Sequence, residues 1–495
     1  MINITQTKTS LSIENFIIQL AKLENVSIDK NKLCYEYSLD GTRHSLIITY
    51  NSPNVEKLFS NSKFKQDAYA FAVVLGVINL TRFGSVLPRK LDISRFSQWI
   101  NADLLNFLSQ TIPHVWSEHR YQLHQTDFVR PEFIFNSSEL DSATNFPLWN
   151  FQQIINNQTK LLVASGAGKD SLLCERLLEK AAVDYDIVTM NFDICGDFDK
   201  QDSLFVSAFK KELSKIHKVY IKDEYYPWLE ERINNFEIRT KLTNKPFRVD
   251  AGGNLQLMFI CVPIQVSYGY EIQAWGNEKS ADLPNLTTDN GEEIAHQWLK
   301  SFAAEQQINQ CFNKLFNNVK QASLLKPIED VKIFKTLFSL DKKLVYKTHS
   351  CNFGKPWCCK CEKCAYVFAG FAAYGDFDKT VTAFGQNLFE KTDLLPIWSE
   401  LMGLKNYIPW ECIGSGTQVQ IYFYRCFKKG ITGAAVDFFI ESILQDLHNQ
   451  GMSEADIDRH FQMLEDKYSV VHENHHTMPD WLWTQIKPLL ADVSG

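Results

Sequence analysis

The pattern of apolar and polar positions in the first part of the chain predicts a mixed α/β region. Residues 32–40 (KLCYEYSLD) and 44–50 (HSLIITY) have the composition of two paired β-strands, and residues 67–83 (DAYAFAVVLGVINLTRF) have that of a core helix. The stretch from Val129 to Pro147 is rich in turn-forming residues. We therefore expect an N-terminal mixed α/β domain over residues 1–147.

From residue 160 the pattern changes to a strand, a glycine turn, a helix and a second strand, which read KLLVAS, GAGKD, SLLCERLLEKAA and DYDIVTMNFD. Short apolar strands that lead into glycine turns and amphipathic helices are typical of a parallel sheet with covering helices. Further alternation follows in KVYIKD, LQLMFICVPIQVSYG and EIQAWGN. We expect this α/β domain to span residues 155–395, and segments such as SEADIDRHFQMLEDKY predict a helical C-terminal region over 396–495.

Composition narrows the class of protein. The chain has 495 residues, of which 45% are hydrophobic and 22% charged, so it is neither disordered nor fibrous. A net charge of −7 argues against a nucleic-acid partner. The longest apolar run, Ala68 to Leu80, is too short to cross a bilayer and is interrupted by Asn79, which favours a buried helix. The N-terminal segment lacks the pattern of a secretory signal, so we expect a cytoplasmic protein with no membrane partner.

A glycine-rich segment, SGAGKDS at residues 165–171, follows the first strand of the predicted α/β domain and precedes a helix. Unpaired amides and the helix dipole make such a position an anion site. A Walker A loop does not fit, because Val163 stands where its first glycine belongs and Asp170 follows the lysine. A dinucleotide-binding fingerprint fails at Ser171, although Asp193 at the end of the next strand leaves that interpretation open.

The segment resembles the S-G-G-x-D-S loop of the PP-loop ATP pyrophosphatases, with the order of the glycines changed. The resemblance implies a PP-loop ATPase-like fold, in which the loop holds the pyrophosphate of ATP while the enzyme releases AMP and adenylates its substrate. It implies ATP and Mg²⁺ as cofactors, with Lys169 supplying charge and Asp170 a contact to Mg²⁺ or to loop amides. Asn277 and Ser280 follow a predicted parallel strand and so line the same crevice. The full set of expected cofactor-binding residues is Ser165, Gly166, Ala167, Gly168, Lys169, Asp170, Ser171, Asn191, Asp193, Asn277 and Ser280.

Five of the twelve cysteines crowd into residues 351–364, which read CNFGKPWCCKCEKC. Cys351, Cys358, Cys361 and Cys364 can close a tetrahedral shell around Zn²⁺, which leaves Cys359 surplus. An iron–sulfur cluster is the alternative, because four cysteines also ligate one. We expect structural zinc. A PP-loop followed by such a cluster is also the layout of the enzymes that make 7-cyano-7-deazaguanine.

Further motifs point to a narrower relative. They are GNEKSAD (276–282) with Asn285, HQWLKS (296–301), SLLKPIED (323–330), the cysteine run itself and PWECIG (409–414). Together they resemble the MurL-type UDP-N-acetylmuramoyl-L-alanyl-L-glutamate epimerases, over residues 160 to 415. The chain departs from that pattern in having SGTQ (415–418) where the family has acidic residues, and HQW where it has HQY. Another peptide that ends in glutamate is therefore an alternative substrate.

The resemblance implies an ATP-dependent epimerase that adenylates the carboxylate of a terminal L-glutamyl residue, inverts its Cα and releases AMP and diphosphate. The substrate would be a small or nucleotide-linked peptide, with UDP-MurNAc-L-Ala-L-Glu as the first choice. A Cα proton beside a carboxylate is very weakly acidic, whereas adenylation removes that negative charge and lets a base take the proton. The candidate catalytic residues in the motifs are Asp170, Glu278, Lys279, His296, Lys300, Glu411 and Cys412.

Two other functions stay open at this point. One is another PP-loop adenylating enzyme, which forms an amide or nitrile or inserts sulfur into a small molecule or a tRNA base. Cys174, within the apolar helix pattern, is a poor thiolation residue, and the net charge of −7 disfavours tRNA. The other is a nucleotide-binding interaction protein with a zinc knuckle. The histidine tract at residues 472–476 (HENHH) is more typical of a solvated loop than of a metal site.

Overall fold

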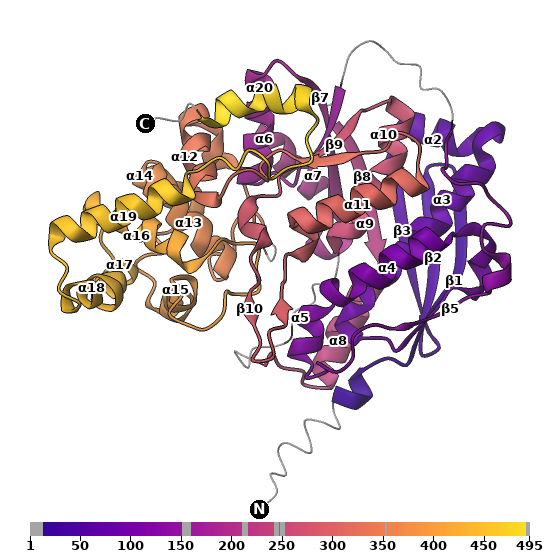
Figure 1. Ribbon diagram of the computed structural model, residues 1–495, viewed down its shortest axis with the longest axis horizontal. Helices are drawn as coiled ribbons and strands as arrows, with labels where there is room; N and C mark the ends of the chain where they lie inside the picture. The colour runs from indigo at the N-terminus through magenta and orange to yellow at the C-terminus, as the bar shows by residue number, and fades with distance from the viewer. Residues whose placement is uncertain are drawn as a thin grey trace, which may run out of the picture.

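The computed structural model describes residues 13–150, 160–209, 216–241, 247, 253–351 and 354–491 (Figure 1). Its described part is a mixed α/β protein built on a mostly parallel sheet of ten strands. The strands lie side by side in the order β12 (Gln321–Ser323), β9 (Ile272–Trp275), β6 (Lys160–Ala164), β7 (Asp184–Phe192), β8 (Ile216–Asp223), β3 (Thr42–Asn51), β2 (Lys32–Leu39), β1 (Leu20–Asp29), β4 (Lys90–Asp92) and β5 (Glu132–Ile134).

The five strands from β12 to β8 are parallel to one another. Numbered by their order in the chain, β6 is the first of these strands and β9 the fourth. Across the sheet from β8 to β12, the order is therefore 3-2-1-4-5, as in doubly wound folds. The order reverses between β6 and β9, which are direct neighbours. In such sheets ligands bind outside the carboxyl ends of the strands at this switch point. The glycine-rich segment after β6 and the GNEKSAD motif after β9 therefore meet at one edge of the sheet.

The N-terminal strands extend the same sheet. The predicted hairpin is confirmed as β2 and β3, and β3 pairs antiparallel with β8, with Leu46 opposite Asp223. Strand β1, which we did not predict, pairs with β2, and β4 and β5 complete the edge. One sheet thus runs through the two regions that we expect to be separate domains. Of the segment that links them, residues 151–159 lie outside the described residues.

The predicted core helix is confirmed as α3 (Lys65–Ile78), which continues into the 3-10 helix η2 (Asn79–Val86). The continuous helical segment Ser62–Val86 is long and apolar enough to cross a membrane, but 94% of its most apolar stretch is buried inside the fold. Its Gly76 carbonyl accepts a hydrogen bond from the Tyr37 hydroxyl of β2. The segment is therefore packed on the sheet as a core helix.

Short helices fill the connections between the strands, and those that bear on the site are introduced with it. They are α2 (Pro53–Ser60), α4 (Ala102–Val115), α5 (Ser117–Gln122), α6 (Lys169–Lys180), α7 (Phe198–Phe209), α8 (Tyr225–Asn235), α9 (Gly253–Ile260), α10 (Val262–Tyr268), α11 (Phe302–Leu315) and α12 (Asp330–Leu340). A two-stranded ribbon, β10 (Leu286–Thr287) and β11 (Glu293–Ile294), lies between β9 and α11 in the chain.

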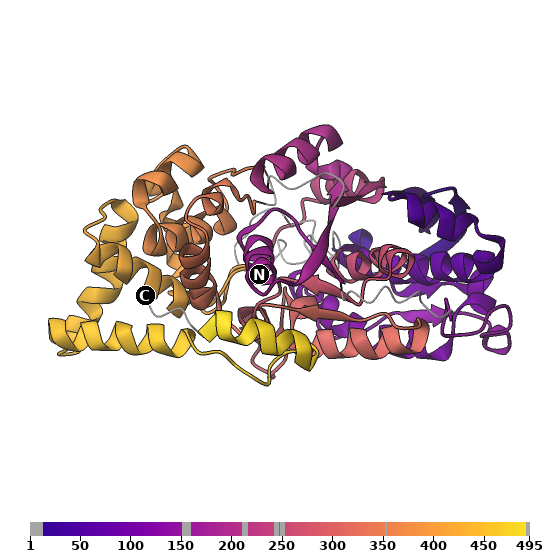
Figure 2. The ribbon, with the colours of Figure 1, turned by 90° about the horizontal axis from the view of Figure 1, so that it is seen from above.

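The C-terminal part is helical, as expected for 396–495, but its run of helices begins earlier, at Glu362, within the region that we expect to be α/β. Figure 2 shows the helical part at the opposite end of the molecule from the N-terminal strands. Its helices are α13 (Glu362–Tyr374), α14 (Phe377–Phe384), α15 (Leu395–Leu401), α16 (Gly416–Lys428), α17 (Ala434–Phe439), α18 (Gln445–Asn449), α19 (Glu454–Tyr468) and α20 (Asp480–Ala491). Helices α13 and α16 pack together, and α20 returns to contact α6. One apolar core joins these helices to α6 and α12, so the helical part is not detached from the α/β sheet.

Candidate functional site

The glycine-rich segment forms a tight connection between β6 and α6. The Ser165 backbone amide donates to the carbonyl of Val188 on the neighbouring strand, and Ala167 adopts a left-handed φ of 61°. Gly168 is the N-cap of α6, and a Cβ at this position would lie 2.9 Å from the Ser350 hydroxyl oxygen. Gly166 is exposed, with no heavy atom within 4 Å of the Cβ that it lacks. The segment is thus open to solvent at Gly166, beside the N-terminus of a twelve-residue helix, where an anion is stabilised.

Lys169 does not extend toward that opening. Its side chain is 1% exposed, and its Nζ lies 2.5 Å from Oδ1 of Asp170 and 2.5 Å from Oδ1 of Asp330. Burial alone would lower the pKa of Lys169, but the two carboxylates raise it well above its usual range. The ammonium that we expect to supply charge to a phosphate is therefore already paired. Asp170, at 26% side-chain exposure, is the solvent-facing member of this cluster.

The GNEKSAD motif approaches the same cluster from β9. A Cβ on Gly276 would lie 3.2 Å from Cβ of Asp170, so the strand end and the first turn of α6 are in close contact. Glu278 is buried, and its pKa is raised by burial and by the charges of Asp330 and Asp170. Asp170 of α6, Glu278 from the loop after β9 and Asp330 of α12 thus lie around the buried ammonium of Lys169.

The other polar residues of this motif bond to the protein itself. The Asn277 side-chain amide donates to the Ser323 hydroxyl (3.2 Å), and the Ser280 hydroxyl donates to Oε2 of Glu329 (2.8 Å). Gln418, one of the residues that departs from the family pattern, is fully buried and donates to both Ser280 and Glu329. Gln418 therefore belongs to a buried hydrogen-bond network and does not face solvent.

A second group of candidates gathers around Cys412. The Lys300 Nζ donates to the Cys412 Sγ at 2.9 Å. Burial would lower the pKa of Lys300, but Cys412 and Glu278 raise it above its usual range. Burial would raise the pKa of Cys412, but Lys300, a hydrogen bond from His296 and the charge of Lys363 lower it below its usual value. The sequence motifs HQWLKS and PWECIG thus meet in space.

Glu118 completes this second group. The Nδ1 atom of His296 lies 2.5 Å from Oε2 of Glu118, and both side chains are 9% exposed. The His296 backbone amide donates to Oδ1 of Asn285 (2.8 Å), which fixes the start of the segment. Glu118 belongs to α5 in the N-terminal region and was missed in the sequence, because SEHRYQ carries no recognisable motif.

Lys326 is a further residue that sequence reasoning missed. Its Nζ donates to the backbone carbonyls of Glu278 (2.7 Å) and Lys300 (2.5 Å), and it is fully buried. It therefore ties the two candidate groups together. Lys326 lies in the motif SLLKPIED, which also contains Glu329 and Asp330. The spacing of residues in that motif does not by itself indicate a role for Lys326.

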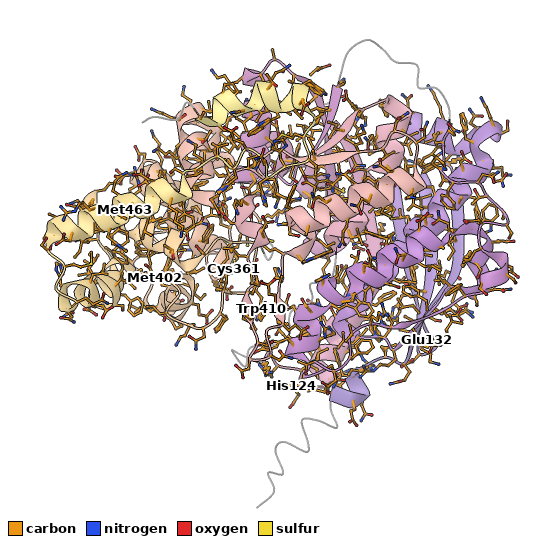
Figure 3. The ribbon with its side chains drawn as sticks, viewed as in Figure 1. His124, Glu132, Cys361, Met402, Trp410 and Met463 are labelled. Atoms are coloured by element: carbon orange, nitrogen blue, oxygen red, sulfur yellow. The ribbon has the colours of Figure 1, made fainter. Side chains whose placement is uncertain are left out.

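The remaining predicted residues lie around these groups. Lys279 has its Nζ 4.0 Å from Oε1 of Glu329, and Glu411 is buried in the turn before Cys412. Ser171 is buried on the first turn of α6, where its hydroxyl faces the Gly168 carbonyl at 3.4 Å. The Asn191 amide donates to Asp202 (2.7 Å), and Asp193 is exposed just beyond β7. Trp410, two residues before Cys412, has its ring centroid 6.2 Å from that of Tyr121 on α5, and Figure 3 shows it between the sheet and the C-terminal helices.

The histidine tract bears on the same region. His475 has its Nε2 atom 2.5 Å from Oδ2 of Asp282, the last residue of GNEKSAD. Thr477 donates its hydroxyl to the buried Glu305 of α11. Among the described residues, the tract does not form a group with metal-ligand spacing. Through these contacts, the segment from His475 to Thr477 attaches the C-terminal part to the GNEKSAD motif and to α11.

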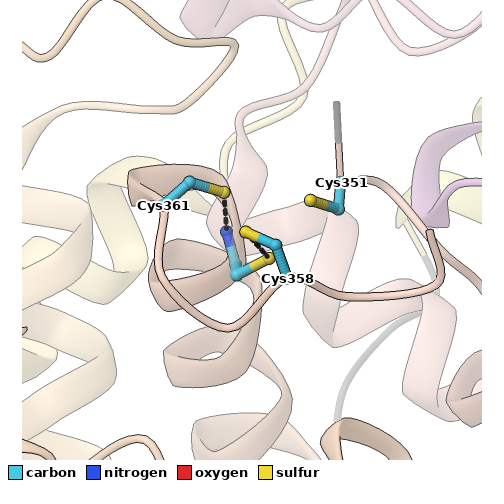
Figure 4. Close-up of side chains that lie close together, drawn as sticks. Cys351, Cys358 and Cys361 are labelled. Carbon is cyan, nitrogen blue, oxygen red and sulfur yellow. Dashed lines mark hydrogen bonds between the residues drawn. The ribbon is translucent and has the colours of Figure 1, made fainter. Parts of the chain in front are cut away.

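The four predicted metal ligands come together, and Figure 4 labels three of them, Cys351, Cys358 and Cys361. The sulfur atoms of Cys351, Cys358, Cys361 and Cys364 all lie within 4.8 Å of one another, and those of Cys358 and Cys364 are 3.8 Å apart. A Zn–S bond of about 2.3 Å places tetrahedral thiolates about 3.8 Å apart, so the four residues fit a single zinc ion. A cluster of several irons would separate the sulfurs further. Cys359 lies outside the group and directs its Sγ to the Phe384 carbonyl.

The cysteine knuckle contacts the glycine-rich segment directly. The His349 backbone amide donates to the Ala167 carbonyl (2.8 Å), two residues before the first cysteine ligand. Ser350 occupies the space beside Gly168 that a side chain there would fill. The knuckle therefore supports the connection between β6 and α6, although the two segments are far apart in the sequence.

Comparison with known proteins matches two segments of the chain to family models. The model of the MurL N-terminal domain matches residues 257–323, and that of the MurL C-terminal domain matches residues 338–430. These matches include GNEKSAD, HQWLKS, PWECIG and all four cysteines, and they confirm the resemblance to the MurL-type epimerases.

Three relatives carry the name UDP-N-acetyl-alpha-D-muramoyl-L-alanyl-L-glutamate epimerase. The chain is 32% identical over 146 residues to one from Micromonospora sp. and 30% identical over 163 residues to one from Salinispora tropica. It is 24% identical over 239 residues to one from Xanthomonas oryzae pv. oryzae. These alignments cover 28%, 31% and 45% of this chain. They span 32%, 35% and 49% of the three relatives, which is half of their length or less.

Proposed function

With the confirmed resemblance to the MurL-type epimerases as the premise, we propose that this protein inverts the terminal L-glutamyl residue of UDP-MurNAc-L-Ala-L-Glu and consumes ATP to do so. The observation that carries the proposal is the meeting of the glycine-rich segment with GNEKSAD at the switch point of a doubly wound sheet, next to the Lys300–Cys412 pair. One edge of the sheet then has a place for phosphate beside groups that can move a proton.

ATP enters this reaction as a substrate. Its phosphates would lie at the exposed Gly166 and at the N-terminus of α6, where the helix dipole favours negative charge. Attack by the glutamyl carboxylate on the α-phosphate forms an acyl-adenylate and releases diphosphate. Lys169 would not contact the phosphates. Its buried ammonium would hold Asp170 and Asp330 in place, because it contacts both carboxylates.

Asp170 is the residue that would hold Mg²⁺. Its carboxylate oxygens are of the ligand type that this ion prefers, and its side chain is partly exposed beside the phosphate position. Glu278 lies close by, with a pKa raised by burial and by Asp330 and Asp170, so a nearby cation would favour its ionised form. When bound, Mg²⁺ supplies charge neutralisation for the diphosphate that leaves.

Adenylation makes the inversion feasible. The carboxylate next to the glutamyl Cα opposes loss of the Cα proton, because the carbanion would form beside a negative charge. The acyl-adenylate has no charge on that group and offers a carbonyl that accepts the electron pair. Addition of a proton to the other face and hydrolysis then give the D-glutamyl peptide and AMP. Hydrolysis of ATP drives the inversion in one direction.

The proposal is tested with the purified protein, ATP, Mg²⁺ and UDP-MurNAc-L-Ala-L-Glu. We expect peptide that contains D-glutamate, measured by chiral analysis after acid hydrolysis, together with AMP and diphosphate in equal amounts. UDP-MurNAc-L-Ala is the matched control and should yield no AMP, because it lacks the glutamyl carboxylate. Release of ADP in place of AMP would contradict the proposal. AMP release with an amide product would favour the amide-forming alternative instead.

A further inference from the structure

We propose that Cys412 removes the Cα proton from the activated glutamyl residue, and that Glu118 is a positioning residue that acts on Cys412 through His296. The proposal rests on the epimerase function proposed above and assigns the proton transfer within it. It also gives the N-terminal region a part in the site, because Glu118 belongs to α5.

The geometry brings four charged or polar groups from three segments to one point. Cys412 precedes α16, Lys300 ends the 3-10 helix η8 (Trp298–Lys300), His296 lies just before η8, and Glu118 lies in α5. The distances are 2.9 Å from Lys300 Nζ to Cys412 Sγ and 2.5 Å from His296 Nδ1 to Glu118 Oε2. A thiol, an imidazole and a carboxylate in sequence form the arrangement that activates a cysteine in nucleophilic enzymes.

The charges that face Cys412 favour its thiolate form. Lys300 donates to the sulfur, His296 forms a hydrogen bond with it, and the Lys363 ammonium of α13 donates to the Cys412 backbone carbonyl. Burial opposes ionisation, yet the pKa of Cys412 is lowered because these groups outweigh it. The nearby acidic groups, Glu278 and Asp170, raise the pKa of Lys300 and so keep its ammonium charged beside the sulfur.

Other candidates are less suited to take the proton. The Lys300 pKa is raised above its ordinary value, so this amine stays protonated and cannot act as a base. The Glu278 pKa is raised by burial and by Asp330 and Asp170, and this carboxylate belongs to the acidic cluster around Lys169, beside the position proposed for Mg²⁺. Lys279 lies beside Glu329, with 4.0 Å between the charged atoms. Cys412 combines a half-buried position with a lowered pKa, as a base that works at neutral pH requires.

The proton transfer balances without a further reagent. The Cα–H bond breaks, an S–H bond forms at Cys412, and the electron pair moves into the carbonyl of the acyl-adenylate. Water gives a proton to the opposite face of Cα and leaves hydroxide. The Cys412 thiol then gives its proton to solvent, where it neutralises that hydroxide, which restores the thiolate and a water molecule.

Cys412→Ala separates this step from adenylation. With UDP-MurNAc-L-Ala-L-Glu and Mg²⁺, the variant should keep ATP–diphosphate exchange but lose Cα deuterium incorporation in D₂O by about 10²- to 10⁴-fold, the usual contribution of a general base. Cys34→Ala, at another half-buried cysteine, is the control and should match the unchanged protein. Deuterium incorporation at the normal rate would overturn the proposal. Loss of the exchange reaction as well would assign Cys412 to binding and would also overturn it.

Glu118→Gln tests the positioning role through a readout that does not require turnover. The rate of Cys412 alkylation by iodoacetamide is measured against pH by peptide mass spectrometry. In the unchanged protein it should rise at lower pH than that of Cys34, whose pKa is raised by burial and Asp29. Without the Glu118 carboxylate the imidazole is less readily charged, so the Cys412 midpoint should move to higher pH.

Glu118→Asp should restore the Cys412 midpoint in part, since it keeps the carboxylate. Glu292→Gln, which removes only the partner of Arg120, should leave it unchanged. A Cys412 midpoint at or above that of Cys34, or one that Glu118→Gln does not move, would refute the proposal. If the unchanged protein shows this alkylation behaviour at Cys412 but no ATP–diphosphate exchange with the glutamyl peptide, the epimerase function is wrong, and only the coupling of Cys412 to Glu118 through His296 stands.

Discussion

Replacing Lys169 by methionine is expected to destabilise the fold by about 3 to 5 kcal/mol and to abolish AMP formation. The ammonium is 1% exposed and contacts Asp170 and Asp330, each at 2.5 Å. Without it, the Asp330 carboxylate, also 1% exposed, loses its cationic partner in a buried site, which is costly. Urea unfolding measures the loss of stability, and ATP–diphosphate exchange measures the loss of the first chemical step.

Three variants separate stability from chemistry in this cluster. Lys180→Met, at the exposed end of the same helix, should change neither quantity. Asp170→Ala removes the solvent-facing carboxylate, so it should keep the fold and still abolish AMP formation. The double variant Lys169→Met with Asp330→Asn removes both buried charges and should regain most of the stability but not the exchange reaction. An active Asp170→Ala protein, or a Lys169→Met protein of normal stability, would refute the roles given to this cluster.

Cys361→Ser is expected to have the second large effect. The unchanged protein should contain about one zinc per chain and show no absorbance in the visible region, since zinc has no redox chemistry or d–d bands. Loss of one ligand should reduce the zinc content to near zero and lower the midpoint of thermal unfolding. Because the His349 amide holds the Ala167 carbonyl, ATP affinity should also fall. Metal analysis, calorimetry and nucleotide titration measure the three changes.

Cys359→Ser is the matched control for the metal site. Cys359 is a neighbour of Cys358 in the chain, but its sulfur lies outside the group of four and contacts the Phe384 carbonyl. Its replacement should leave the zinc content and ATP affinity unchanged. A brown preparation that contains iron would contradict the choice of zinc. Full ATP affinity in a zinc-free Cys361→Ser protein would contradict the link between the knuckle and the glycine-rich segment.

Most of the individual strands and helices could be predicted from local patterns of apolar and polar residues. The apolar run KLLVA with its glycine turn predicted β6 and α6, and the alternation in KLCYEYSL and HSLIITYN predicted β2 and β3. The pairing of β3 with β8 could not be predicted, because it joins strands about 170 residues apart through backbone hydrogen bonds that leave no mark on side-chain pattern. For the same reason, the continuity of the sheet across the predicted domain boundary is visible only in the structure.

The candidate site was predictable where spacing within a motif carries chemistry. The four cysteines fall into this class, and the structure brings their sulfurs together. Glu118 does not, because its role arises only from the approach of α5 to His296, a contact that spans 178 residues. Lys169 shows a third case, in which the motif was seen but the direction of the side chain depended on Asp330, 161 residues away.

The central claim is that ATP cleavage and inversion at the glutamyl Cα occur in one site. It is tested most directly by incubating the protein with ATP, Mg²⁺ and UDP-MurNAc-L-Ala-L-Glu in D₂O and analysing the product by mass spectrometry and NMR. We predict one deuterium at the glutamyl Cα of each inverted molecule, with one AMP released per inversion. Inverted product without deuterium, or deuterium incorporation that proceeds at full rate without ATP, would contradict the account.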